Sequence, residues 1–478
     1  MVSVCAARSV IALAQDNVLP DESDSRMVRQ VLSLKGIDGF TSTVVIEMQD
    51  WDNKELVEMI AGDFAEVIVA HDVIGRLMIQ CARQPGLAHV LESLMGFDGS
   101  EFYMQNWPEL TGVKFGDLLT RFEDAVVAGI MRSDGTILLN PSDDLEVGDG
   151  DEIIVLAEDN DSYKPASSSW RSSDAVPNPP ERVKSANAEK LLFCGWRRDM
   201  ADMILQLDGY VPKGSELWLL STVPADRRHE LLTDHGRKEE LQTKNLVIKN
   251  VMGSPVVRRD LWVLNAVDEH GRVQFLRDDE GVLVLDEGGQ AREDSVTLDK
   301  FDSVLILADA GEDEKSTMES TDSRSLASML IIQDIQKKLG GGKECCDPIS
   351  EILDRSTRSL LNICGGTGYI MSNQIVSAVI AQVSERREMN GLLGELLAAD
   401  GNEPYIREIE LYLDLALRRD YSFWEVLLIA RKRGEILLGF VRANALDAQN
   451  ERTMLNPPDK AQKIRWETGD AFIVLALE

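Results

Sequence analysis

Three sequence motifs each occur twice in this chain, and they follow the same order in both copies. Asp-Ser-Arg stands at residues 24–26 and 322–324, and Leu-Asn-Pro at 139–141 and 455–457. Gly-Asp precedes an apolar run at 150–157 and again at 469–476. The copies lie 298, 316 and 319 residues apart, and so long a period is typical of duplicated domains rather than of a solenoid. We therefore expect two similar domains within the 478 residues.

The first part of each copy alternates apolar runs of strand length with helical patterns. In residues 1–70, apolar runs at 9–14, 44–47 and 66–70 enclose helical patterns that begin at Asp24 and Lys54. Residues 190–370 repeat this alternation, and they include a strand and a helix within 302–340. Asp322 is the expected N-cap of this helix and Gly340 its expected end. This pattern predicts a parallel, doubly wound sheet, and such sheets bind ligands at the carboxyl ends of their strands.

The remaining segments also repeat. Residues 71–96 and 371–398 are predicted to form pairs of helices. The first helix, with His71-Asp72 as its expected cap, is apolar on both faces, so it is expected to pack outside its own sheet. Residues 97–159 and 399–478 predict small α+β lobes. Residues 160–189 have prolines among serines and predict a linker, and an acidic insertion at 265–300, with Asp278-Asp279-Glu280, predicts a surface hairpin or a disordered loop. The expected fold class is α/β, with two domains that pair about a pseudo-two-fold axis.

Composition excludes several classes of function. The formal net charge of −32, from 82 acidic and 50 basic residues, argues against binding to nucleic acid or to an anionic membrane surface. No GxSxG motif and no P-loop is present, and Gly195 is followed by Trp196 and Arg197 where a dinucleotide fingerprint needs further glycines. We therefore expect neither an enzyme nor a bound nucleotide. No apolar run approaches the roughly 20 residues that span a bilayer, so this chain by itself is expected to be soluble.

Acidic side chains recur where the predicted strands end, and they are the candidate metal ligands. Parallel strands bring such ends together, and oxygen ligands without histidine or cysteine favour Ca²⁺ over Mg²⁺. The alternative is that the aspartates next to helix starts, among them Asp322, are plain helix caps. A Glu-x-x-Asp pair that recurs in both copies favours a cation site in the first copy. The candidate ligands are Glu47, Asp50, Asp16, Asp24 and Asp72 in the first copy, and Glu351 and Asp354 in the second.

Several long motifs of the chain resemble those of a known protein family, the CASTOR/POLLUX ion channels of plants. The resemblance covers nearly the whole chain, from Ser9 to Leu477. It is carried by residues 44–48 (VVIEM), 69–81 (VAHDVIGRLMIQC), 193–199 (FCGWRRD), 214–218 (GSELW), 321–327 (TDSRSLA) and 350–354 (SEILD).

The resemblance implies two tandem RCK domains, the regulators of K⁺ conductance, each with a Rossmann-like N-lobe, a crossover helix pair and a C-lobe. The first domain then comprises 1–70, 71–96 and 97–159, and the second, after the linker 160–189, comprises 190–370, 371–398 and 399–478. In the family, four chains form a gating ring below a tetrameric pore in the nuclear envelope membrane, and Ca²⁺ regulates cation flux linked to nuclear calcium signalling. We expect a homo-tetramer through RCK domain pairing, with the pore helices and the first strands of the first domain missing from this chain.

The resemblance also bears on the ligand set. RCK domains of calcium-gated potassium channels carry acidic ligands at the end of a sheet strand, and Glu47 matches that position. Their second glutamate, two residues further on, is replaced here by Gln49, with Asp50 beside it. The expected function is Ca²⁺-responsive regulation of a channel. The alternative is a nucleotide-sensing regulatory subunit of a potassium transport system.

Overall fold

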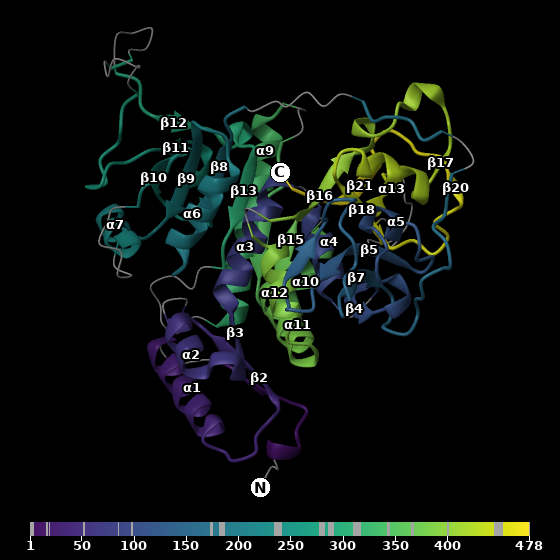
Figure 1. Cartoon of the computed structure of the whole chain (residues 1–478). Helices are drawn as coiled ribbons and strands as arrows, with labels where there is room; N and C mark the ends of the chain where they lie inside the picture. Colours follow the sequence, from purple (N-terminus) through teal and green to yellow (C-terminus); the bar gives the residue numbers. More distant parts are fainter. Residues whose placement is uncertain are drawn as a thin grey trace.

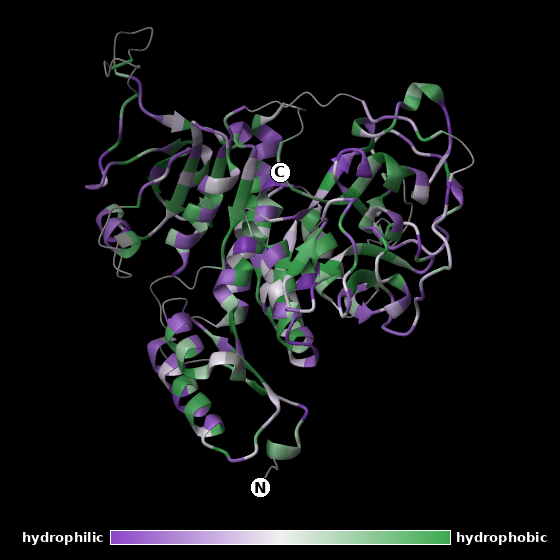
Figure 2. Cartoon of the chain, viewed as in Figure 1, coloured by the Kyte–Doolittle hydropathy of each residue, from purple (hydrophilic) through white to green (hydrophobic). Residues whose placement is uncertain are grey.

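The computed structural model places two domains of like construction side by side (Figure 1). It describes residues 4–15, 18, 20–50, 53–84, 86–96, 99–172, 175–180, 187–233, 241–276, 283–284, 291–308, 317–341, 345–364, 368–398, 401–443 and 453–477. Figure 2 shows the apolar residues gathered on the strands and on the helix faces between the lobes, while the outer loops are polar.

The first domain begins with a small parallel sheet. Among the residues described, β1 (Ser9–Ala12), β2 (Thr43–Met48) and β3 (Ala65–Val69) lie in that order, connected by α1 (Pro20–Lys35) and α2 (Lys54–Ala61). Side chains alternate across β2, because Val44 and Ile46 belong to the same cluster as Val31 of α1, whereas Val45 belongs to the central core. The predicted alternation of strand and helix is confirmed.

The second domain contains a larger sheet of the same kind. In the described part of the chain, six parallel strands lie in the order β10-β9-β8-β13-β14-β15. The strands are β8 (Lys190–Cys194), β9 (Ser215–Ser221), β10 (Leu246–Met252), β13 (Ser303–Ile306), β14 (Ile349–Ile352) and β15 (Tyr369–Met371). The helices are α6 (Met200–Tyr210), α7 (Ala225–Thr233), α8 (Arg258–Trp262), α9 (Met318–Leu339) and α10 (Thr357–Cys364). The strand order reverses direction at β8 and β13, which is where doubly wound sheets bind ligands.

The insertion between β10 and β13 forms a hairpin, which is one of the two structures predicted for it. Strands β11 (Leu264–Asn265) and β12 (Ser295–Val296) pair antiparallel, and Phe275 bridges to Glu293 further out. The acidic residues 278–280 lie outside the described residues.

The two C-lobes share one antiparallel topology. Strands β4 (Glu101–Asn106), β5 (Ala125–Met131), β6 (Ile137–Leu139) and β7 (Glu152–Ala157) lie in the order β4-β7-β5-β6. Strands β16 (Glu403–Glu408), β18 (Ile436–Val441), β19 (Thr453–Leu455) and β21 (Ala471–Ala476) lie in the matching order β16-β21-β18-β19. Helix α5 (Phe115–Leu118) precedes β5, and α13 (Phe423–Arg431) precedes β18, flanked by the short pair β17 (Tyr421–Ser422) and β20 (Lys463–Ile464).

Even the irregularities of the two C-lobes repeat. The register of β5 shifts between Val127 and Gly129, and that of β18 shifts between Leu437 and Gly439. A Cβ atom on Gly129 would stand 2.4 Å from the carbonyl oxygen of Leu138, so the bulge needs glycine there for close approach of the neighbouring strand.

The crossover helices are exchanged between the domains. Helix α3 (Ala70–Arg83) packs against α6, β13 and β14 of the second domain, and α11 (Ser372–Glu385) packs against β1 and β2 of the first (Figure 1). Each is followed by its short partner, α4 (Leu87–Met95) or α12 (Met389–Leu396). Equivalent glutamines form equivalent bonds across the pair: Gln80 Nε2 donates to Leu396 O at 3.1 Å, and Gln382 Nε2 donates to Met95 O at 3.2 Å. The predicted packing of residues 71–84 outside their own sheet is confirmed.

Three predicted helix starts are wrong. Helix α9 begins at Met318, behind a capping box of Thr317 and Ser320, so Asp322 lies inside the helix. Helix α1 begins at Pro20, four residues before Asp24, and α3 begins at Ala70, before Asp72. Gly340 does follow the last residue of α9, as predicted.

The predicted linker is anchored on the C-lobes over its described part. Ala166 N donates to Arg121 O at 2.7 Å, and Trp170 N donates to Thr120 O at 3.0 Å. The ring of Trp170 stacks on that of Trp424, with centroids 6.2 Å apart. The segment therefore ties the first C-lobe to the second instead of serving only as a spacer.

Candidate functional site

Two glutamates occupy equivalent places at the carboxyl ends of the parallel strands. Glu47 lies on β2 and its Oε2 accepts from the backbone N–H of Ala14 at 3.1 Å, just beyond β1. Glu351 lies on β14 and its Oε2 accepts from the backbone N–H of Ala308 at 2.9 Å, just beyond β13. Each carboxylate thus holds the loop after the neighbouring strand, and the repeated Glu-x-x-Asp spacing reflects a repeated structural position.

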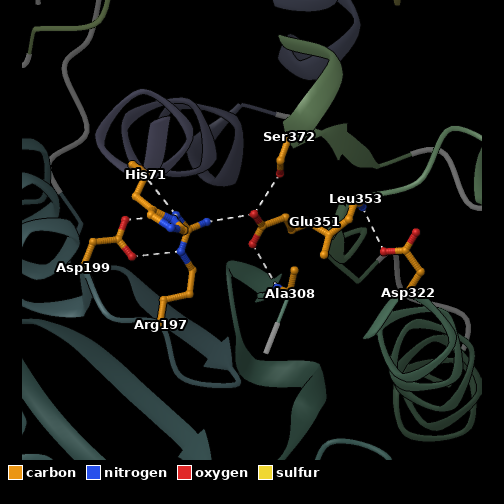
Figure 3. A network of polar contacts seen from close by, with 8 residues as sticks. All are labelled: His71, Arg197, Asp199, Ala308, Asp322, Glu351, Leu353 and Ser372. Atoms are coloured by element: carbon orange, nitrogen blue, oxygen red, sulfur yellow. Dashed lines mark hydrogen bonds and ion pairs between the residues drawn. The ribbon is translucent and has the colours of Figure 1, made fainter. Parts of the chain in front are cut away.

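Two aspartates that were expected to cap helices instead hold the loops after β2 and β14. Asp24 is 1% exposed and accepts from the backbone N–H groups of Gln49 and Asp50, at 3.0 and 3.1 Å. Asp322, also 1% exposed, accepts from the backbone N–H of Leu353 at 2.8 Å (Figure 3) and from that of Asp354, also at 2.8 Å. Each of these buried carboxylates is stabilised by backbone N–H donors of another loop. The aspartate therefore stands within its helix and does not cap it.

A buried arginine neutralises the strand ends of the second domain. Arg197, in the turn after β8, is 6% exposed and donates to Glu351 Oε1 at 2.9 Å and to both oxygens of Asp199, at 2.9 and 3.0 Å (Figure 3). Ser372 Oγ, at the start of α11, donates to the same Glu351 oxygen at 2.8 Å. Burial by itself would lower the pKa of Arg197, but the carboxylates of Glu351 and Asp199 raise it, so the guanidinium stays charged.

The same turn also reaches the first domain. Arg197 Nη2 lies 3.3 Å from both His71 Nδ1 and the carbonyl oxygen of His71, at the start of α3. The next residue, Arg198, forms ion pairs with Asp50 and, at 3.2 Å, with Asp21. Two consecutive arginines of the second domain therefore contact residues that follow the strands of the first: His71 at the start of α3, Asp50 after β2 and Asp21 at the start of α1. The approach is close, because a Cβ on Gly75 of α3 would stand 3.1 Å from Asp199 Oδ2.

Those predicted metal ligands that the structure describes do not gather into one cluster. Among the described residues, no three His, Cys, Asp or Glu side chains are placed to hold a metal ion. Asp72 pairs with Arg76 at 3.0 Å in its own helix, and Asp354 accepts from Ser356 N at 2.9 Å. Asp16 lies outside the described residues. Glu47 lies on β2, and Asp50 follows the end of that strand, so both stand at the carboxyl edge of the first sheet.

The turn that would hold a dinucleotide is filled by protein. Gly195, with φ of 109°, is the glycine that lets the chain turn after β8, and Arg197 then occupies the strand end. Trp196 and Arg197 were predicted only as obstacles to a cofactor, and the role of Arg197 and Arg198 as partners of the strand-end carboxylates was missed. The signal available was their charge, since two basic residues in a turn at an acidic strand edge indicate ion pairs.

Comparisons with known proteins identify the family. A family model described as "Castor and Pollux, part of voltage-gated ion channel" matches residues 71–173. The chain is 39% identical to the "Probable ion channel POLLUX" of Oryza sativa subsp. japonica, over 99% of this chain and 47% of that protein. It is also 39% identical to the "Ion channel CASTOR" of Lotus japonicus, over 99% of this chain and 54% of that protein. The chain belongs to the CASTOR/POLLUX ion channel family. It spans about half the length of the CASTOR and POLLUX relatives that it matches.

The fold agrees with this membership. The human SLO3 gating ring superposes with a TM-score of 0.66 at 12% identity, covering 99% of this chain and 88% of that one. The fold predicted from the CASTOR/POLLUX resemblance, two tandem RCK domains with Rossmann-like lobes, is confirmed. No described helix is both long and apolar enough to cross a membrane.

Proposed function

We propose that this chain is the gating-ring region of a CASTOR/POLLUX-type cation channel, and that Ca²⁺ binding at Glu47 and Asp50 of the first domain controls ion flux. In the complete protein, four copies would pair through their RCK domains below a pore in the nuclear envelope. The proposal rests on the observation that the strand-end carboxylates of the two domains are joined by Arg197 and Arg198.

The two domains differ in how their strand ends are neutralised, and the difference favours the first domain as the calcium site. Glu351 has a buried internal cation, since Arg197 lies 2.9 Å away with a side chain only 5% exposed. Asp50 is paired with Arg198, whose side chain is 37% exposed. An ion pair that reaches solvent contributes only about 0–1 kcal/mol to stability. A divalent cation therefore displaces the arginine from such a pair more readily than from a buried one.

Competition of this kind gives a mechanism for regulation. If Ca²⁺ takes Asp50, Arg198 loses its partner and the contact between the domains weakens on that side, while the Arg197 contact with His71 remains. A ligand shifts an equilibrium between two ring states only by its different affinity for them, and here the difference is the presence or absence of Arg198 on Asp50. Ca²⁺ takes six to eight oxygen ligands, so waters, backbone carbonyls or a second copy must complete the shell.

Calcium calorimetry on the whole chain tests the assignment. Glu47→Gln with Asp50→Asn should weaken Ca²⁺ binding, because both carboxylates lose their charge. Arg198→Gln should strengthen it by about two- to five-fold, because the competing ion pair is gone. Asp354→Asn is the matched control at the equivalent position of the second domain and should leave the affinity as it is.

Unchanged affinity in the double variant would remove the site assignment, and an equal loss in Asp354→Asn would place calcium in the second domain. A rise in melting temperature with ADP, ATP or NAD, with Ca²⁺ inert, would instead support a nucleotide-sensing subunit.

A further inference from the structure

One adjacent pair of cysteines, Cys345 and Cys346, occurs among the six cysteines of this chain. The pair lies between α9 and β14, and β14 begins three residues after Cys346, at Ile349. The five cysteines whose side chains the structure describes are thiols and form no disulfide. Two thiols at consecutive positions react with each other under oxidation if they are accessible and held close together, so the exposure and the contacts of the pair decide whether it is a modification site.

Exposure distinguishes this pair from the other described thiols. Cys81 and Cys194 are 1% and 0% exposed, and burial raises the pKa of both thiols, so neither reacts readily. Cys5 is exposed, but no second cysteine stands beside it in the sequence. Cys345 and Cys346 are both partly exposed. Among the described thiols, this pair therefore combines access for a small oxidant with a second sulfur at the next residue.

One residue of α9 contacts both thiols of the pair. Cys345 Sγ donates to the carbonyl oxygen of Gln336 at 3.8 Å. Gln336 Nε2 in turn donates to Cys346 Sγ at 3.5 Å. Gln336 is only 4% exposed, so it is a fixed part of the helix surface. Both sulfur atoms therefore face the same position of α9, which keeps them near each other.

The two thiols differ in their surroundings. Cys346 packs against the core cluster that contains the buried face of α9, and burial raises its pKa to about 11, so it stays a protonated thiol. Cys345 lies near Lys300, because hydrogen bonding to Asp299 raises the pKa of this lysine and Cys345 adds to the rise. The thiolate is the form that attacks an oxidant, and a nearby cation favours the thiolate. Cys345 is therefore the better nucleophile of the two.

We propose that Cys345 and Cys346 form a reversible disulfide with each other when the chain meets hydrogen peroxide, and that this bond is a redox switch on the loop before β14. In the first step, the sulfur of Cys345 attacks one peroxide oxygen, the O–O bond breaks, and Cys345 becomes a sulfenic acid while one water leaves. In the second step, the sulfur of Cys346 gives up its proton and displaces the hydroxyl group, which leaves as a second water. Two thiols are oxidised and one peroxide is reduced to two waters.

The disulfide is easily reduced because the two residues are neighbours. The peptide bond between them is trans, and consecutive Cα atoms are then about 3.8 Å apart. Disulfides ordinarily join Cα atoms about 4.4–6.8 Å apart, and a bond outside this range is strained. Strained disulfides have the higher reduction potentials of labile, regulatory bonds. A cellular thiol therefore returns the pair to its reduced state.

Closing the ring changes the chain just ahead of a buried ion pair. Bond formation draws Cys346 Sγ toward Cys345, and Cys345 loses the proton that it donates to Gln336, so both contacts of the loop with α9 are weakened. Glu351, which Arg197 contacts at 2.9 Å, stands five residues after Cys346. The switch thus acts on the segment that leads into β14, and it does not depend on calcium binding in the first domain.

Mass spectrometry on the full chain tests the proposal. The chain is treated with hydrogen peroxide, its remaining thiols are alkylated with N-ethylmaleimide, and it is digested with trypsin. Cleavage after Lys343 and Arg355 gives a peptide, residues 344–355, that contains both cysteines of the pair and no other. We expect this peptide to lose two hydrogen atoms and take up no N-ethylmaleimide, and dithiothreitol should restore both labels. Cys5, in the peptide 1–8, is the internal control and should remain labelled.

Two serine variants assign the steps and the effect. Cys346→Ser should leave Cys345 as a sulfenic acid that dimedone traps, because the second thiol is missing. Cys345→Ser should give about fivefold less dimedone adduct, since Cys346 lies against the core and stays protonated. Peroxide should lower the melting temperature of the natural chain by about 2–4 °C relative to Cys345→Ser treated in the same way, because the contacts with Gln336 are weakened.

Three results would each overturn the proposal. The first is a peptide 344–355 that keeps both labels at a peroxide concentration at which Cys5 has lost its label. The second is a disulfide that links this peptide to another one, such as the peptide that contains Cys364. The third is a disulfide within the pair that leaves the melting temperature equal to that of the reduced chain, since a bond without effect on the loop is no switch.

Discussion

Arg197→Met removes a buried guanidinium but keeps most of the length of the side chain. In the structure this guanidinium donates to Glu351 Oε1 and to both oxygens of Asp199, and its side chain is only 5% exposed. Methionine leaves two carboxylates close together with no nearby cation and little water. The variant therefore tests whether the strand end of the second domain depends on this one charge.

The expected cost follows from the geometry. Breaking a buried ion pair by removing one partner costs about 3–5 kcal/mol, because the remaining charge stays buried. We expect Arg197→Met to lower the free energy of unfolding by about 4 kcal/mol. Adding Glu351→Gln removes one of the stranded charges, and the double variant should recover about 1–3 kcal/mol of that loss. Arg198→Met, at the neighbouring and more exposed pair with Asp50, should cost no more than about 1 kcal/mol.

Urea unfolding of the four proteins, followed by tryptophan fluorescence, measures these differences. Trp196 stands next to Arg197, and its ring lies under the guanidinium of Arg228, with 5.8 Å between them, so its emission reports on this turn. Two results would refute the reasoning. One is a cost below about 1 kcal/mol for Arg197→Met, and the other is a double variant that is less stable than Arg197→Met alone.

Two further predictions concern the C-lobes. Gly129→Ala should destabilise the first C-lobe by about 1–3 kcal/mol, because the added Cβ would stand 2.4 Å from Leu138 O. Gly439→Ala should destabilise the second C-lobe by a similar amount. Equal melting temperatures for these variants and the natural chain would contradict this prediction. Burial lowers the pKa of Lys460 from 10.5 to about 8. The unfolded chain then holds more protons than the folded chain between these values, so stability due to Lys460 rises with pH from about 8 to 10. Thermal unfolding across this range should show the rise in the natural chain relative to Lys460→Met, and parallel curves would exclude it.

Much of the fold could be predicted because the pattern that specifies it is local. The apolar run at residues 44–47, between two helical patterns, predicted a strand of a parallel sheet. The first helix of residues 71–96, apolar on both faces, predicted its packing outside its own sheet. The helix starts at Asp24, Asp72 and Asp322 were wrong because an aspartate near a helix start has the same local signature whether it caps the helix or reaches another loop. Which of the two it does depends on residues such as Asp354, far away in the sequence.

The candidate site was predicted less completely. Glu47 and Glu351 were placed at equivalent strand ends by their spacing, and the structure brings each to a backbone N–H of the neighbouring loop. The pairing of Glu351 with Arg197 could not be predicted, because 154 residues separate them.

By itself, the order of residues determined that this protein is a duplicated pair of α/β domains, since periodicity and repeated motifs depend only on neighbours along the chain. Tertiary structure decided which backbone N–H groups and which guanidinium groups these carboxylates contact. The physical reason is that a charge is neutralised by whatever lies a few ångströms away in space. For Glu351 that neighbour is Arg197, 154 residues away in the same domain, and for Asp50 it is Arg198 of the other domain.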